Sequence, residues 1–263
     1  EMIARKMIGM TGADLRNLAN EAALVATRLG KDKVERSDFE VAADRVLIGP
    51  KREEVLTPED KRRTAYHEVG HALVTWLMPG ADRPQKVSIV PRGQSLGVNL
   101  NAPDEDRFHH GLDHFKNQLV MIMGGRAADR LVYNQPYAGA ESDLKRATRL
   151  ARMMVTHWGM SEKLGPMTFK VGEEHVFLGK EMQEARDFSE QTAALIDSEV
   201  QNFLRQADET AFNLLSDNRV YVEKIVEELM GKEELLRDEI EDILRQSGFN
   251  VTPSKSSANP TDV

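Results

Sequence analysis

The chain has 263 residues and a formal net charge of -8 at pH 7, with 43 acidic side chains against 35 Lys and Arg side chains. This acidic balance argues against nucleic-acid binding, because phosphate contacts require a basic surface. The sequence contains no cysteine, which excludes disulfide bonds and thiolate ligands, so any metal site must use nitrogen and oxygen atoms. A chain of this length is typical of two domains with separate cores.

No apolar run approaches the roughly 20 residues that a membrane-spanning helix needs. The first residues, EMIARKMIGM, also lack the pattern of a signal peptide. We therefore expect this chain by itself to be soluble. Because the sequence begins abruptly, in what reads as the tail of a domain, we expect it to be a fragment of a longer protein.

The first predicted elements are two short helices. Residues 11–30, TGADLRNLANEAALVATRLG, place apolar side chains at helical spacing, with Thr11 as the predicted N-cap and Gly30 as the predicted stop. A second helix is predicted over residues 37–49. Two helices of this size bury little apolar surface on their own.

Composition predicts the domain boundaries. The polar stretch PKREEVLTPEDKRR reads as a linker that runs into the next helix, and it separates residues 1–50 from residues 51–250. Residues 251–263 contain TPSKSSANPTDV, a segment rich in Ser, Pro and Asn that we expect to be disordered.

The larger segment is predicted to be mainly helical. A helix is expected over residues 59–78, where Pro79 and Gly80 end it. Alternating apolar and polar residues predict one β-hairpin over residues 86–100. The remaining predicted helices lie at residues 115–134, 142–159, 180–207, 208–230 and 232–246.

The stretch TAYHEVGHALV places two histidines and a glutamate in an apolar run. His67 and His71 are four residues apart, so on a helix their rings share one face and can bind a single ion. Glu68 lies about 100° round the helix from His67. This H-E-x-x-H pattern is typical of zinc proteases, in which the glutamate acts on the water that the metal activates.

The competing interpretation is a set of ordinary core histidines that hydrogen-bond carbonyl groups. The chain has seven histidines, and a chance match to the whole motif has odds of about one in a hundred. Burial of two imidazoles and a carboxylate also costs several kcal/mol unless a cation compensates. The motif therefore favours a metal site.

A catalytic zinc needs a third protein ligand and an open position for water. Spacing alone leaves these downstream candidates: His109, His110, Asp113, His114, Asp129, Glu141, Asp143, His157 and His175. Asp143 starts a helix whose apolar face continues to Met154, so its carboxylate is expected to point inward. The alternative role for Asp143 is an N-terminal acid that interacts with the helix dipole. The cluster RFHHGLDH lies in a polar connection and is expected to be a solvated loop.

Several blocks of the sequence resemble the FtsH-type membrane-anchored AAA+ zinc metalloproteases, over residues 11–244. GADLRNLANEAALVA is similar to the last helices of the family's ATPase module, the lid subdomain. TAYHEVGHALV resembles the family's TAYHEAGHAVV, with Val69 where alanine is usual. IVPRGQSLGV, GGRAADRLVY, GAESDLKRATRLARMMV and WGMSEKLGPM each resemble a block of the peptidase domain, in the same order. Ordered blocks are more specific than a single motif.

The resemblance implies a fold and a set of site residues. The fold is a helical zinc-metallopeptidase domain with one small β-hairpin or sheet, preceded by the end of an AAA+ lid. Asp143 is implied as the third zinc ligand beside His67 and His71, and Glu68 as the catalytic residue. Asp129 lies where the family usually carries a glutamate, and we expect it near the site as a partner that orients a ligand.

The resemblance also implies a function. It is a zinc endopeptidase, with one Zn²⁺ per chain, that degrades unfolded or membrane-extracted proteins in protein quality control. ATP dependence would come only from an ATPase module upstream of this chain, and attachment to the membrane from helices there. The implied assembly is a homohexamer on the cytoplasmic side of the cell inner membrane.

Two other functions remain as alternatives. One is a non-catalytic scaffold or chaperone-like ring subunit, whose signature would be the loss of a zinc ligand or of the glutamate; His67, Glu68, His71 and Asp143 are all present. The other is a purely structural zinc, which leaves the glutamate without a role and is uncommon in chains without cysteine. The same ligand set also accepts other divalent metals.

Overall fold

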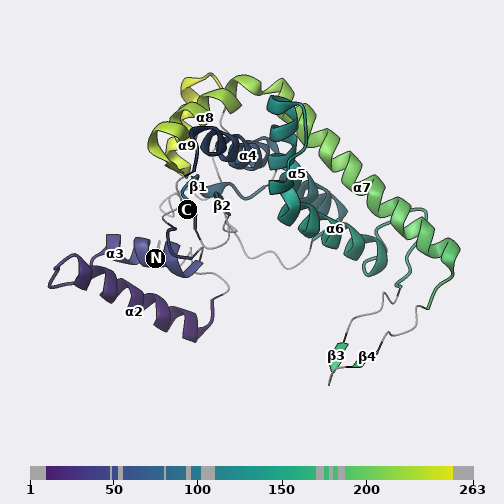
Figure 1. Ribbon diagram of the computed structural model, residues 1–263. Helices are drawn as coiled ribbons and strands as arrows, with labels where there is room; N and C mark the ends of the chain where they lie inside the picture. The colour runs from purple at the N-terminus through teal and green to yellow at the C-terminus, as the bar shows by residue number, and fades with distance from the viewer. Residues whose placement is uncertain are drawn as a thin grey trace, which may run out of the picture. The chain divides into compact units, whose positions relative to one another are not determined.

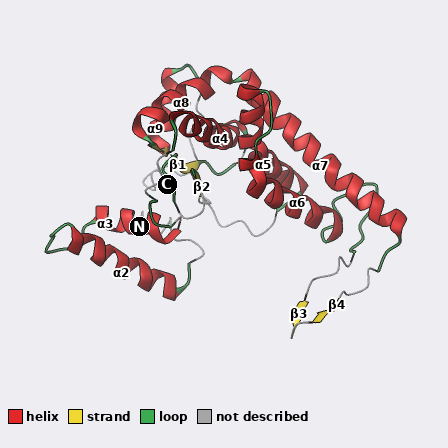
Figure 2. Ribbon diagram, viewed as in Figure 1, coloured by secondary structure: helices red, strands yellow, loops and turns green. Residues whose placement is uncertain are grey.

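The computed structural model describes residues 10–47, 49–52, 56–79, 81–92, 96–101, 110–169, 175–177, 180–182 and 187–250. The chain divides into two compact units, Glu1–Asp106 together with Asn218–Val263, and Arg107–Asp217. Helices dominate both units (Figures 1 and 2), which confirms the mainly α fold class. Within the described ranges, no helix combines the length and the apolar character that a membrane crossing requires. The predicted tail, residues 251–263, lies outside the described residues.

Helices α2 (Gly12–Arg28) and α3 (Arg36–Leu47) pack against each other. The Thr11 hydroxyl accepts a hydrogen bond from the Asp14 backbone N–H at 3.3 Å, and the Asp14 carboxylate accepts one from the Thr11 N–H at 2.9 Å. This capping box confirms the predicted start of the first helix. The buried core of the pair consists of Leu18, Ala22, Ala42 and Ala43.

Helix α4 (Pro58–Leu77) carries the H-E-x-x-H motif, and most of its residues from Ala65 to Trp76 are buried. Thr57 caps it by accepting a hydrogen bond from the Asp60 N–H at 3.1 Å, and Pro58 occupies the first turn, where a missing N–H is tolerated. The predicted helix, residues 59–78, agrees with these bounds to within one residue. Helix α4 packs against α8 (Arg219–Lys232) and against two strands (Figure 1).

Those two strands form the predicted hairpin. Strand β1 (Pro84–Ser88) pairs antiparallel with β2 (Val98–Asn101), with Ser88 opposite Val98. A third strand, β5 (Glu234–Leu236), pairs antiparallel with the other side of β1, so the order is β2-β1-β5. The sequence patterns did not predict β5, which comes just before α9 (Arg237–Gln246).

In its described residues, the second unit has its long helices packed together. Helix α5 (Leu112–Tyr133) packs against α6 (Glu141–Thr156) and α7 (Glu190–Asp217), and α6 also packs against α7. A short 3-10 turn, η1 (Ala138–Ala140), leads into α6.

Most of the predicted helix boundaries after residue 180 are wrong, although the predicted end at residue 246 agrees with the end of α9. Lys180–Met182 is strand β4, which pairs with β3 (His175–Phe177), and the helix begins only at Glu190. The predicted break at Asp208 is absent, because its carboxylate lies 2.5 Å from Arg130 and 3.4 Å from Arg126 on α5 and so belongs to a packed helix face. The observed break is at Asn218.

Candidate metal centre

His67 and His71 lie one turn apart on α4, and both side chains are half-buried. Their Nε2 atoms are 3.3 Å apart, with the ring planes at 82° to each other. Two nitrogens bound to one tetrahedral zinc at about 2.05 Å each would be separated by about 3.3 Å. The two imidazoles therefore already have the separation that a shared zinc ion requires.

Asp143 is the third member of a possible metal-binding group with His67 and His71. It occupies the first turn of α6 and is half-buried. One ligand atom each from His67, His71 and Asp143 lie within 4.8 Å of one another, and together they form a group that could hold a metal ion. Among the described residues, no other group of three or more His, Asp or Glu side chains brings its ligand atoms this close together.

The donor set fits zinc by its chemistry. Two neutral imidazoles and one carboxylate give an N₂O set that leaves a fourth tetrahedral position for water or substrate, as in catalytic zinc sites. One carboxylate neutralises only half of the charge of a divalent cation, so the occupied site would keep a net charge of about +1. The set therefore fits a catalytic site better than a closed structural one.

Glu68 is buried beside the first histidine, with 8% of its surface exposed. Its backbone carbonyl lies 3.4 Å from the Nδ2 donor of Asn99, which belongs to β2. Gly97, just before β2, lies against the Glu68 side chain itself. The sequence patterns did not single out Gly97 or Asn99; the one signal was a glycine inside a strand pattern, which often marks a close approach of the backbone.

The other histidine candidates, and Asp113, do not join this group in the described part of the chain. His110 is exposed and stacks on the half-buried His114, with ring centroids 4.0 Å apart, and Asp113 is exposed. His157 is exposed at the end of α6, where its Nδ1 lies 2.8 Å from the Thr156 hydroxyl. His109 lies outside the described residues, as does the side chain of His175.

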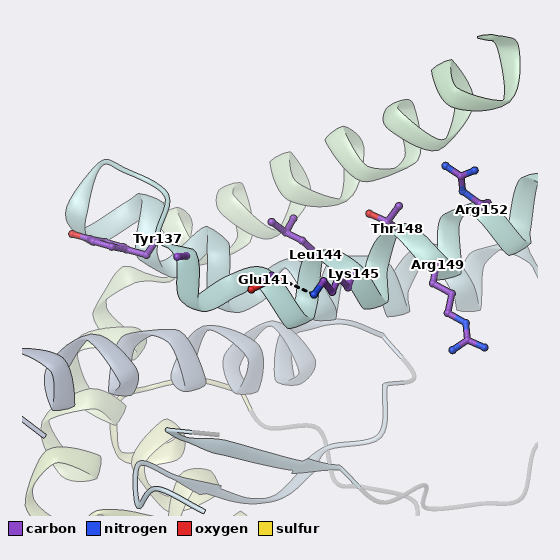
Figure 3. A pocket seen from close by; sticks show the side chains of 8 residues that line it. Tyr137, Glu141, Leu144, Lys145, Thr148, Arg149 and Arg152 are labelled. Atoms are coloured by element: carbon purple, nitrogen blue, oxygen red, sulfur yellow. Dashed lines mark ion pairs between the residues drawn. The ribbon is translucent and has the colours of Figure 1, made fainter. Parts of the chain in front are cut away.

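Glu141 is engaged elsewhere. Its carboxylate is 71% exposed and accepts a hydrogen bond from Lys145 at 2.6 Å, and this bond lowers the pKa of Glu141 below its usual value (Figure 3). Both residues line a groove of about 710 Å³ along η1 and α6. The other lining residues are Tyr137, Ala138, Leu144, Thr148, Arg149 and Arg152. Asp143, although on the same helix, does not line it.

Asp129 lies on α5 and is only 2% exposed. A buried carboxylate needs a compensating partner, so its position is compatible with a role in orienting a ligand. That role stays a prediction.

The helical fold and the pair of histidines one turn apart on α4 are those of a possible metal-binding site of the H-E-x-x-H class. Residues 54–243 match the family model described as "Peptidase family M41", and residues 1–41 match the "AAA+ lid domain". The chain belongs to peptidase family M41.

Curated relatives agree with this assignment. The chain is 47% identical over 245 residues to "ATP-dependent zinc metalloprotease FtsH 1" of Rhodopirellula baltica, a match that covers 93% of this chain and 36% of the relative. It is 46% identical over 262 residues to "ATP-dependent zinc metalloprotease FtsH 4" of Sphaerobacter thermophilus, which covers 100% of this chain and 39% of the relative. The chain thus spans less than two fifths of the length of these relatives.

Proposed function

We propose that this chain is the peptidase part of an ATP-dependent zinc metalloendopeptidase that degrades unfolded or membrane-extracted proteins. The observation that carries the proposal is the pair of Nε2 atoms of His67 and His71, 3.3 Å apart on the helix that also buries Glu68. In this proposal, His67, His71 and Asp143 hold the metal. The names of the relatives support both the zinc and the ATP dependence.

Each side chain has a defined task in peptide hydrolysis. Zinc, when bound, would make a water molecule more acidic and polarise the scissile carbonyl. The two histidines and Asp143 would hold that metal. The Glu68 carboxylate accepts a proton from the attacking water and passes it to the leaving amine, as a general base and then a general acid.

Strand β2 offers a place for the substrate backbone. The hairpin has two arms that could pair with an extended peptide, but β1 already pairs with β2 and β5, so β2 is the arm at the edge of the described sheet. Asn99 of β2 also approaches the Glu68 carbonyl. An extended peptide added to this edge would be held by main-chain hydrogen bonds, which give affinity with little sequence preference.

The same resemblance supports our proposal for the domains and the assembly of the longer protein. Residues 1–50 would be the end of an AAA+ lid, residues 51–250 the peptidase domain and residues 251–263 a disordered tail. ATP hydrolysis would belong to the rest of the AAA+ module, and the assembly would be a homohexamer at the cytoplasmic side of the cell inner membrane. The alternative of a non-catalytic scaffold subunit is not favoured, because the chain retains all four site residues.

The test is Glu68→Gln in the intact, zinc-loaded protein with ATP present. We expect one zinc per chain to remain and cleavage of denatured casein to fall by about 10² to 10⁴-fold, because the proton acceptor is lost. Glu59→Gln is the matched control: the same substitution on the same helix, at a side chain that is 79% exposed. Unchanged cleavage by the Glu68→Gln protein would remove the proposed mechanism.

A further inference from the structure

Gly97 and Glu68 make an unusually close contact. A Cβ atom at Gly97 would lie 2.6 Å from Cγ of Glu68, 2.7 Å from its Oε1 and 2.8 Å from Cγ2 of Thr64. All three separations are shorter than a Cβ atom tolerates from a carbon or oxygen atom, so a neighbouring group would have to shift. By contrast, Gly111 and Gly231 have no heavy atom within 4 Å of the corresponding position, so the crowding at Gly97 is a local property.

Glu68 has little room to move away from this contact. Its side chain is 8% exposed, and the nearest atom is Cγ, close to the helix backbone, so relief would require a different rotamer for the whole carboxylate arm. Thr64 is equally constrained, because it is β-branched and its hydroxyl donates to the Asp60 carbonyl at 2.9 Å.

The segment that carries Gly97 is also held in place. The next residue, Val98, pairs with Ser88 in the sheet, and Asn99 approaches the Glu68 carbonyl. Gly97 does not have a left-handed φ angle, so alanine could adopt its backbone conformation. The contact with Glu68 and Thr64, and not backbone strain, is therefore what excludes a side chain here.

We propose that Gly97 is a positioning residue for the Glu68 carboxylate. Because it has no side chain, the backbone before β2 closes over Glu68 and restricts the orientation of its carboxylate, on the helix that also carries the two histidines. The inference rests on the proposed function, in which Glu68 moves the proton. A displacement of about 1 Å in such a group can lower a rate by about 100-fold.

The experiment compares Gly97→Ala with Gly231→Ala in the intact, zinc-loaded protein. Gly231 is exposed on α8, has no atom within 4 Å and has no left-handed φ angle, so it controls for the added methyl group. For Gly97→Ala we expect one zinc per chain, a KM within about twofold of the wild-type value and a kcat lowered by about 10 to 100-fold. Gly231→Ala should match the wild type in all three.

A rescue variant separates positioning from general damage. Thr64→Ser removes the Cγ2 atom that crowds Gly97 but keeps the hydroxyl that binds the Asp60 carbonyl. We expect Gly97→Ala/Thr64→Ser to regain part of the lost kcat, whereas Thr64→Ser alone should stay near the wild type. Non-additivity of this kind is expected only for residues in contact.

A crystal structure of the Gly97→Ala protein gives a readout that does not depend on activity. We expect a changed Glu68 rotamer, with His67 and His71 in place. An unchanged rotamer or an unchanged kcat would overturn the inference, as would failure of both Gly97 variants to fold, since Gly97 would then serve the fold alone. Absence of cleavage by the wild type would instead overturn the proposed function, and the rotamer comparison would still decide the role of Gly97.

Discussion

Tyr66, one residue before the first histidine of the possible metal-binding group, donates a hydrogen bond of 2.5 Å from its phenolic hydroxyl to Oε2 of Glu223. This bond connects α4 with α8, because Tyr66 belongs to the former and Glu223 to the latter. Burial raises the pKa of Tyr66, and the bond to the Glu223 carboxylate raises it further. The phenol therefore stays protonated, and remains a donor, throughout the pH range in which a peptidase works.

Tyr66→Phe should destabilise the protein without removing the metal. A hydrogen bond to a charged group contributes about 1.5 to 3 kcal/mol, and this one is half-buried, with the Glu223 side chain 42% exposed, so the free energy of unfolding should fall by about the lower end of that range. Zinc content should stay at one per chain, because His67 and His71 are unchanged. Urea denaturation measures the loss, and Tyr137→Phe, whose hydroxyl accepts a hydrogen bond from the exposed Gln135, is the control. Equal stability of both variants would show that the bond to Glu223 does not support α4.

The helices that the sequence predicts well have local stop and start signals. Thr11 caps α2, and Thr57 with Pro58 starts α4, so both boundaries depend only on residues within one turn. Strand β5 has no such signal: it is three residues long, and Glu234 meets its partner Ser88 across 146 positions of sequence. Its formation depends on tertiary pairing, which period-2 patterns in so short a segment cannot reveal.

The candidate site likewise has features that local spacing predicts and features that depend on tertiary packing. The separation of His67 and His71 follows from helix geometry, so spacing alone predicts that they share a face. The position of Asp143 depends on how the chain folds between α4 and α6, and for that reason spacing left it among several candidates until the family resemblance selected it. The contact of Gly97 with Glu68 is a matter of packing between a helix and a strand, and only coordinates show it.

Asp143→Asn should release the metal. The neutral amide is a poorer ligand than the carboxylate, and loss of an outer partner alone already lowers metal affinity by about 10 to 100-fold, so loss of a direct ligand should exceed this range. Zinc content after gel filtration measures the effect. The control is Glu141→Gln, two residues earlier on α6, where the carboxylate is exposed and bound to Lys145. Full zinc retention by Asp143→Asn would move the third-ligand assignment to another acid, Asp129 first.

Asp129→Asn tests whether this buried acid orients a ligand. If it does, zinc affinity should fall by about 10 to 100-fold while one zinc per chain still binds at saturating metal. Competition with a chelator of known affinity measures the change, and circular dichroism checks that α5 stays folded. A variant that binds zinc as tightly as the wild type would contradict the role and leave Asp129 as part of the core of the second unit.

The lowered pKa of Glu199 should make the stability of the second unit sensitive to acid. It is 5% exposed on α7 and accepts hydrogen bonds from Lys163 at 2.6 Å and from Ser161 at 2.8 Å. The bond from Lys163 first, and that from Ser161 in addition, lower its pKa in spite of burial.

Because the folded-state pKa lies below the usual value of 4.5, ionised Glu199 stabilises the folded state above about pH 4.5, and this stabilisation is lost as the pH falls through the folded-state pKa. Glu199→Gln should therefore lower the free energy of unfolding at pH 7 by about 1 to 3 kcal/mol and make Tm less dependent on pH below 4.5. Thermal melts between pH 3 and pH 7 measure both effects. Glu209→Gln, on the same helix with a side chain that is 68% exposed, should keep the wild-type acid dependence. An unaltered pH profile in Glu199→Gln would mean that other carboxylates control acid unfolding.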